Sequence, residues 1–390
     1  MLSVLQKARK SLARAAAVVA ALAVSACVPT GPAGGPSIDT SAVVPVALLV
    51  PGGSGQASDE LLARSLQNAA RLAISDLGTV RIDLRVYNTA GQPGQAQAMA
   101  TKAIDEGAKI ILGPVFAQEA NAAGVAAAAR GINVLSFSNN PDIAGGNVFV
   151  LGPTFDNTAA RLARYAVRNG KSRIMIVNDK NTAGELGRAA IQRGVSAAGG
   201  SVVASDSYEF SQNGVVSAAP RIVATAKSSG AQAVFLTADT AGALPLISQM
   251  LSENGLPPSV TQYIGLTRWD IPAATLALPG VQGGWFALPD PQLYQQYQSR
   301  YQAAFGEAPH PISGLAYDGI AAIGALVKQG KANALTGAAL TQGAGFVGVN
   351  GIFRLRSDGT NERGLAVAQI SNNQMVVIDP APRSFGGAGF

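Results

Sequence analysis

The sequence predicts an α/β protein with two lobes, each built on a parallel sheet flanked by helices. From residue 44 onward, short apolar runs alternate with amphipathic segments. The loops between them are short, and glycine is abundant, with 45 among 390 residues. The alternation comes in two sets that meet near residue 150. Because alternating strands and helices form parallel sheets covered on both faces, two sets indicate two lobes.

The first set of elements contains four predicted strands and three predicted helices. Leu62, Leu66 and Ala69 recur at helical spacing in the first helix, and Ser58 is expected to cap it. The third strand ends where Gly113 meets Pro114. The predicted strands are 44–50, 80–87, 109–112 and 133–137, and the predicted helices are 58–77, 94–107 and 118–130.

The second set repeats this rhythm, and the end of the chain breaks it. Its predicted helices are 157–169, 184–198, 215–229 and 241–254, and its predicted strands are 173–177, 202–210, 233–237, 263–266 and 281–287. Two amphipathic helices follow at 291–305 and 314–328. A β-hairpin of 351–356 and 365–370 is expected next, then a strand at 372–378 and a mobile tail at 380–390.

The N-terminal residues 1–26 have the features of a secretory signal, with a basic head before an apolar run at 15–26. The only cysteine, Cys27, follows directly. The string VSAC at this point resembles the bacterial lipobox, which implies a lipidated Cys27 and a membrane anchor. Residues 28–42 are rich in Pro, Gly and Ser and predict a flexible tether. Val28, not Asp, follows the cysteine, which favours the outer over the inner membrane.

The charge of the chain does not indicate a nucleic-acid partner. The formal net charge is +6, but four of the 29 basic residues lie within residues 1–26. Removing that segment leaves 25 basic residues against 23 acidic ones, which is nearly neutral. Nucleic-acid binding requires a clustered basic patch.

Several strings of the sequence resemble the type I periplasmic binding proteins, above all the leucine/isoleucine/valine-binding group. They are VPVALLVPGGSG, ILGPVFAQEANAAGVAAAARGINVLSFS, RIMIVNDKNTAGELGRAAIQRGVSAAGGSVV, YQQYQSRYQAAFGEAPHPISGLAYDGIAAI and VNGIFRLRSDGTNERGLAVAQI. Their order and spacing over residues 43–379 carry the resemblance. It implies two lobes joined by three crossovers, with a ligand in the cleft between them. Lobe one is expected at 43–150 plus 291–345, and lobe two at 151–290 plus 346–379.

Candidate ligand-binding residues lie where predicted strands end, since open α/β sheets bind ligands at the carboxyl ends of their strands. The candidates are Ser54, Phe116, Gln118, Ser136, Ser138, Asn139, Asn178, Asp239 and Trp269. Each has an alternative role in packing, capping or turn formation.

Two positions depart from the amino-acid-binding pattern of the family. Residues 116–120 are FAQEA where amino-acid binders carry serines, and Ala183 stands where a tyrosine is frequent. A ligand ammonium and carboxylate would lose partners there. A different solute therefore remains open, as does the absence of any small ligand.

Catalytic chemistry has few candidate residues. His310 is the only histidine, no GxSxG motif is present, and the glycine-rich PGGSG lacks the Lys-Ser/Thr of a phosphate loop. No metal or cofactor is expected. The sequence favours a non-enzymatic receptor that presents a small polar solute, such as an amino acid, to an ABC-type permease. It leaves two alternatives: a lipoprotein resembling the penicillin-binding protein activators, which regulate a peptidoglycan synthase, and a hydrolase of cell-wall fragments with two carboxylates.

Overall fold

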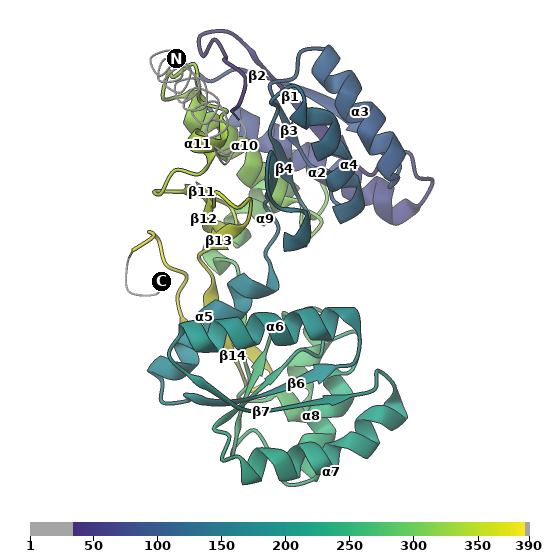
Figure 1. The fold of residues 1–390 in the computed structure, drawn as a ribbon, viewed down its shortest axis with the longest axis vertical. Helices are drawn as coiled ribbons and strands as arrows, with labels where there is room; N and C mark the ends of the chain where they lie inside the picture. Colours follow the sequence, from purple (N-terminus) through teal and green to yellow (C-terminus); the bar gives the residue numbers. More distant parts are fainter. Residues whose placement is uncertain (1–33, 387–390) are drawn as a thin grey trace, which may run out of the picture.

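The computed structural model describes residues 34–386, which form two α/β lobes stacked along the long axis of the molecule (Figure 1). The predicted fold class is confirmed, since each lobe is a largely parallel sheet flanked by helices. The predicted signal peptide and the lipidation of Cys27 lie outside the described residues.

The sheet of the first lobe has five parallel strands in the order β2-β1-β3-β4-β5. Their bounds are β1 Val44–Val50, β2 Ile82–Asn88, β3 Ile110–Leu112, β4 Val134–Ser136 and β5 Val148–Val150. Val46 and Leu48 of β1 belong to the core on one face, and Ala47 and Leu49 to the core on the other, because side chains alternate along a strand. The short strand β5 was not predicted.

Helices cover both faces of this first sheet. α3 (Pro93–Asp105) and α4 (Ala117–Ala128) bury their alanines against one face. The other face is covered by α2 (Ala57–Ser75) and α10 (Gly314–Val327), and α9 (Pro291–Phe305) and α11 (Gly337–Leu340) add to the same core. The cap of α2 is Gln56, not the predicted Ser58.

The sheet of the second lobe has seven strands in the order β15-β14-β10-β9-β8-β6-β7. Their bounds are β6 Arg173–Asp179, β7 Ser201–Tyr208, β8 Ala233–Leu236, β9 Gln262–Gly265, β10 Trp285–Leu288, β14 Ala366–Ser371 and β15 Gln374–Asp379. The first five strands are parallel, and β14 and β15 are antiparallel. The helices α5 (Phe155–Arg168) and α6 (Thr182–Ala197) cover one face, and α7 (Gln212–Ser228) and α8 (Leu244–Glu253) cover the other.

A third, small sheet corrects the prediction for the end of the chain. β12 (Gly351–Leu355) pairs with β11 (Phe346–Gly348) and β13 (Asn361–Arg363), whereas β14 pairs with β10 and β15. The hairpin predicted between 351–356 and 365–370 is therefore wrong. Phe346 and Phe353 belong to the core of the first lobe. Residues 346–363, which the sequence analysis assigned to lobe two, thus pack with the first lobe.

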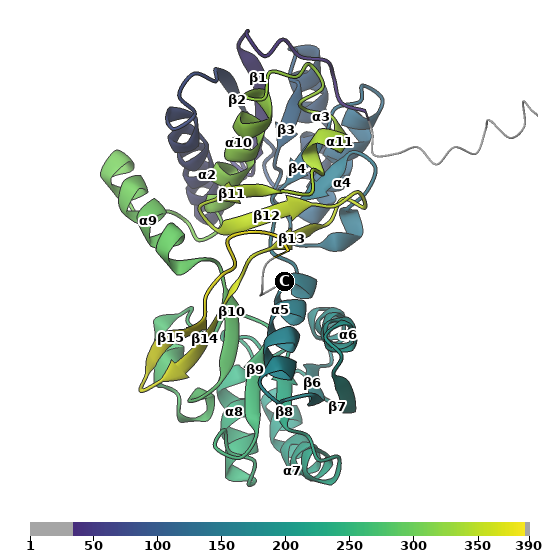
Figure 2. The same cartoon turned by 90° about the vertical axis from the view of Figure 1, so that its left-hand side faces the viewer.

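Three crossovers connect the lobes, as the sequence predicted (Figure 2). The first runs through residues 151–154 between β5 and α5. The second runs through residues 289–290 between β10 and α9, and the third through residues 364–365 between β13 and β14. All three lie at the waist of the molecule.

Both terminal segments make contacts that the sequence did not predict. Ile38 is 6% exposed within the first core, and its N–H donates to the Ala332 carbonyl at 2.9 Å. The flexible tether predicted through residue 42 is therefore wrong at this position. Near the other end, Ala381 is buried and the Arg354 guanidinium lies 4.5 Å from the Phe385 ring centroid. The expected mobile tail thus contacts the folded chain as far as it is described. No helix within residues 34–386 is long and apolar enough to span a membrane.

Candidate functional site

A cavity of about 250 Å³ lies between the lobes and touches all three crossovers. The first lobe contributes the start of α10, and the second contributes the loop after β9 and the end of β10. Its walls are mainly apolar: Pro153, Phe155, Leu266, Ile271, Ala287, Leu288, Pro289, Pro311, Ile312, Leu315 and Leu365. The polar lining residues are Thr154, Thr158, Thr267, Arg268, Asn350 and Arg363. Such a concave, apolar site with few polar groups is typical of small-molecule binding.

Arg268 is brought to the cavity by the loop that follows β9. Its guanidinium binds the Asp270 carboxylate through Nε at 2.8 Å and through Nη2. The pair is partly exposed, with 33% of the Arg268 side chain accessible. A planar guanidinium held on one edge by a carboxylate keeps a fixed orientation. Arg268 is therefore a positioned cation at the wall of the cavity.

Trp269 anchors this loop in the core of the second lobe and does not line the cavity. Its side chain is fully buried in the second-lobe core. A Cβ on Gly265 or Gly284 would lie 2.2 or 2.3 Å from the indole ring, so both glycines leave the space that the ring fills. The prediction that placed Trp269 among ligand contacts is wrong for this arrangement. Its role is to hold the neighbouring Arg268 and Asp270 in place.

Arg363 lines the cavity from the start of the third crossover. It donates from Nε to the Leu151 carbonyl at 2.9 Å and from Nη1 to Asp318 of α10 at 3.3 Å. Both side chains of this ion pair are buried. Burial raises the pKa of Asp318, whereas Arg363 and the Asn350 amide act to lower it. Arg363 thus joins a crossover to the first lobe.

The predicted residues of the first lobe follow β1, β3 and β4, as expected. The Ser136 hydroxyl donates to the Pro114 carbonyl at 3.0 Å and accepts from the Ser138 N–H at 3.1 Å. The Ser138 hydroxyl accepts from the Asn140 N–H, and the Ser54 hydroxyl accepts from the Gln56 N–H. These hydroxyls shape the turns at the strand ends. Phe116, Gln118 and Asn139 are exposed there.

Two further predicted residues lie at strand ends of the second lobe: Asn178 near the end of β6, and Asp239 after β8. Asn178 is buried, and its amide donates to Glu185 at 3.0 Å. Asp239 is exposed and accepts from the Gly242 N–H. Beside them, Asp179 accepts from the Tyr208 hydroxyl, and burial raises the pKa of its carboxyl.

None of the nine predicted residues lines the cavity within residues 34–386. The interlobe hydrogen bonds cluster at the crossovers, as between the Gly152 N–H and the Ser138 carbonyl at 3.1 Å, and between the Asn157 amide and the Asn361 carbonyl at 3.0 Å. The strand-end residues therefore lie outside this cavity. Sequence reasoning pointed to the segment 268–270 but selected Trp269 there, whereas Arg268 lines the cavity. It missed Thr154 and Arg363, although a Pro beside a crossover, such as Pro153, was an available signal.

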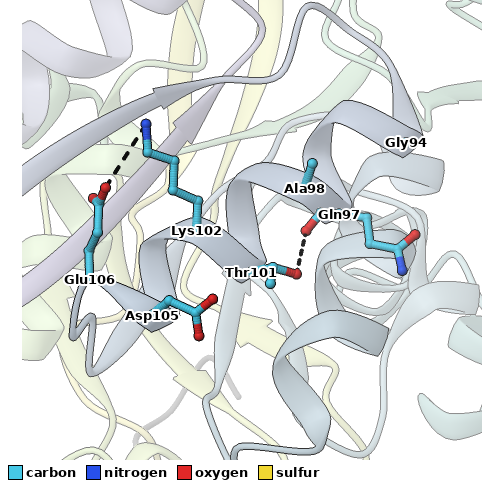
Figure 3. Close-up of a pocket in the computed structure, with 7 residues that line it drawn as sticks. All are labelled: Gly94, Gln97, Ala98, Thr101, Lys102, Asp105 and Glu106. Atoms are coloured by element: carbon cyan, nitrogen blue, oxygen red, sulfur yellow. Dashed lines mark hydrogen bonds and ion pairs between the residues drawn. The ribbon is translucent and has the colours of Figure 1, made fainter.

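A shallow hollow lies on the outer face of α3, apart from the crossovers (Figure 3). Lys102 and Glu106 form an ion pair at 3.9 Å, and the Thr101 hydroxyl donates to the Gln97 carbonyl. Asp105 and Glu106 are exposed on this helix face. Within residues 34–386, no group of three or more His, Cys, Asp or Glu residues could hold a metal ion.

The chain matches the family model described as periplasmic binding protein over residues 43–374. The chain belongs to the periplasmic binding proteins. Membership implies a periplasmic location. A comparison with curated proteins gave no match.

Solved structures of this family share the fold at low sequence identity. One, described as a branched-chain amino acid ABC transporter of Rhodospirillum rubrum, has a TM-score of 0.72, is 18% identical, and matches 86% of this chain and 100% of its own. A substrate-binding protein of Desulfitobacterium hafniense in complex with Leu has a TM-score of 0.63 at 18% identity, over 86% and 100% of the two chains. A solute-binding protein of Rhodopseudomonas palustris in complex with 3,4-dihydroxybenzoic acid has a TM-score of 0.58 at 20% identity, over 87% and 96%. None of these three structures is described as a peptidoglycan-synthase activator.

Proposed function

We propose that this periplasmic binding protein is a solute receptor that holds a small solute between its lobes and presents it to an ABC-type importer. The observation that carries the proposal is the cavity at the crossovers, because its walls come from both lobes. Rotation of one lobe against the other would enclose a solute there. A volume of about 250 Å³ limits the solute to a small molecule.

The neighbours support a solute with an apolar body and a carboxylate. Leucine in the Desulfitobacterium hafniense complex and 3,4-dihydroxybenzoic acid in the Rhodopseudomonas palustris complex share these two features. The apolar walls and Arg268 offer matching partners for both. Apart from the fully buried Trp269 and from Asp239, which binds its own turn, the strand-end residues named from the sequence remain proposed contacts for the closed arrangement.

Thermal unfolding of residues 28–390 against a panel of small carboxylic acids, amino acids and cell-wall fragments tests the proposal. A solute at about 100 times its Kd adds about 2.7 kcal/mol of stability, which raises the midpoint. Thr158→Trp, which fills the cavity from α5, should abolish the shift, whereas Thr101→Trp on the exposed face of α3 should keep it. A panel without any stabilising solute would contradict the receptor function.

We also propose that Cys27 carries a lipid that anchors the receptor to the outer membrane. The support is the sequence around Cys27, which follows an apolar run and is the only cysteine of the chain. Two or more acyl chains are needed for stable anchoring. Cys27→Ser should move the protein from the membrane fraction to the soluble periplasmic fraction. An unchanged distribution between the two fractions would contradict the anchor.

A further inference from the structure

The polar groups of the cavity differ from those that an amino acid requires. A buried ammonium needs an anionic or strongly accepting partner, and a buried carboxylate needs donors. Among the described residues that line the cavity, none is an aspartate or a glutamate. The ionisable side chains in the lining are Arg268 and Arg363. The cavity therefore offers cations to a ligand.

The carboxylates at the nearby strand ends do not supply a partner for a ligand ammonium either. Asp179 is buried against the Tyr208 hydroxyl, and Asp239 binds the backbone of its own turn. Neither residue lines the cavity. Arg363 is also engaged, since its donors bind Leu151 and Asp318. This leaves Arg268 as the cation with donors for a solute.

Arg268 keeps one edge of its guanidinium for a second carboxylate. An arginine carries five N–H donors, and Asp270 accepts from Nε and from one N–H of Nη2. The remaining donors are on Nη1 and on the other side of Nη2, in the planar geometry that suits a carboxylate. The cavity that Arg268 lines has mainly apolar walls, so that a ligand ammonium bound there would be desolvated beside a cation.

We propose that the solute is a small apolar monocarboxylate, aliphatic or aromatic, whose carboxylate binds Arg268 and which lacks an α-amino group. This inference rests on the proposed receptor function. The apolar body lies against residues such as Leu266, Ile312 and Leu315. Because the described lining of the cavity has no anionic partner for an ammonium, it suits this solute class better than the amino acids.

A matched set of ligands tests the inference by calorimetry on residues 28–390. Leucine and 4-methylpentanoate differ by the α-amino group alone, and 3-methylbutylamine keeps the amine without the carboxylate. We expect 4-methylpentanoate or benzoate to bind at least about tenfold more tightly than leucine, a difference of about 1.4 kcal/mol, and the amine not to bind. Arg268→Met should weaken the carboxylate at least about tenfold.

The outcomes separate the two proposals. Arg221→Met removes an exposed arginine of the same lobe and should leave the affinity unchanged. Leucine binding as tightly as 4-methylpentanoate would overturn the solute class while supporting the receptor function. Carboxylate binding that survives Arg268→Met would overturn the role of Arg268. If no ligand of this set or of the wider panel bound, both proposals would fail.

The C-terminal segment carries a second, independent inference. Arg161 of α5 donates to the Pro380 carbonyl at 3.3 Å and pairs with Asp379 at 2.9 Å, and Ala381 belongs to the second-lobe core. Four residues later, Phe385 lies under Arg354 of the small sheet, which packs with the first lobe. In Figure 1 this segment rises from the second lobe beside the small sheet.

We infer that residues 381–385 form a strap, a fourth link between the lobes that limits their rotation. Four extended residues span at most about 14 Å, so the two anchors cannot separate further while both are held. Larger rotation requires release of one of these two anchors, such as the Phe385 ring from Arg354. The strap thereby favours the arrangement described here.

Pulsed electron paramagnetic resonance without ligand tests the strap separately from the receptor function. Spin labels at Val125→Cys and Val216→Cys, exposed on α4 and α7, report the distance between the lobes in a Cys27→Ser background. Phe385→Ala should make the distance distribution roughly twice as wide, whereas Phe385→Tyr keeps the ring and should preserve it. Identical distributions for Phe385→Ala and the parent protein would overturn the inference.

Discussion

The first and third crossovers differ from the second in how they are held. The Asn361 amide donates to the carbonyls of Val150 and Gly152, both at 2.8 Å, and thereby ties the third crossover to the first. Arg363 adds a bond to Leu151. At the second crossover, the Asp290 N–H donates to the Asn350 carbonyl at 3.4 Å, which is a long hydrogen bond.

This difference indicates how the lobes can rotate. Buried side chains that satisfy backbone carbonyls make two crossovers one rigid unit on the first-lobe side. The flexible positions are then the short stretches beyond those bonds, at residue 153 and at residues 364–365. Among the described residues, no buried side chain ties the second crossover to another in this way, so the second crossover follows the rotation.

Loss of the buried arginine should have the largest effect. Arg363→Met removes the partner of Asp318 and leaves a buried carboxylate uncompensated. Breaking such a buried pair costs about 3–5 kcal/mol. Urea unfolding at pH 7 measures the loss. As a control, Arg193→Met breaks the exposed pair with Asp156 and should cost less than about 1 kcal/mol.

The pH dependence of this loss identifies Asp318 as its cause. Burial raises the pKa of Asp318, and Arg363→Met removes the main group that lowers it. The folded variant then binds a proton more readily than the unfolded chain, so that its stability rises as the pH falls. We expect the deficit of Arg363→Met to shrink between pH 7 and pH 5. A deficit that is constant with pH would assign the loss to packing instead.

Removing the hydrogen bonds by which Asn361 clamps the third crossover to the first should have an intermediate effect on stability. Asn361→Leu leaves the buried carbonyls of Val150 and Gly152 without this donor and should cost about 1–3 kcal/mol. Pro289→Ala at the second crossover should cost less than about 1 kcal/mol, because that residue anchors no such network. Urea unfolding compares the two variants. Equal losses would contradict the contrast between the crossovers.

The sequence predicted most elements but not their pairing at the end of the chain. Pro291 at the start and Gly306 at the end of α9 made the bounds 291–305 readable in advance. In contrast, β13 is the polar triplet Asn361–Arg363, which has no apolar pattern, so 351–356 was paired with the next apolar run. Its partners are chosen by packing on the first-lobe core, which no local signal encodes.

The candidate site was less predictable than the fold for a related reason. The rule that ligands lie at strand ends led to Trp269, but the ring is accommodated by Gly265 at the end of β9 and by Gly284 just before β10. Arg268 stands next to it and reaches the cavity because the ring is buried. The residues of the crossovers meet only when the two lobes are assembled.

Removing the cap of α5 should have the smallest effect on stability, but it should also weaken solute binding. Thr154 accepts from the Asn157 N–H at 3.3 Å and lines the cavity. Ser211 caps α7 in the same way, at 3.0 Å from the Gly214 N–H, away from the crossovers. Thr154→Ala and Ser211→Ala should each cost about 1 kcal/mol in urea unfolding.

Their effects on solute affinity should differ, since Thr154 also fixes the first crossover beside the cavity. We expect Thr154→Ala to weaken solute binding about fivefold, which corresponds to about 1 kcal/mol, and Ser211→Ala to leave it unchanged. Calorimetry with the stabilising solute measures both. If the two variants bound the solute equally well, the cap would stabilise α5 without shaping the site, and the clamp at Asn361 and Arg363 alone would position the first crossover.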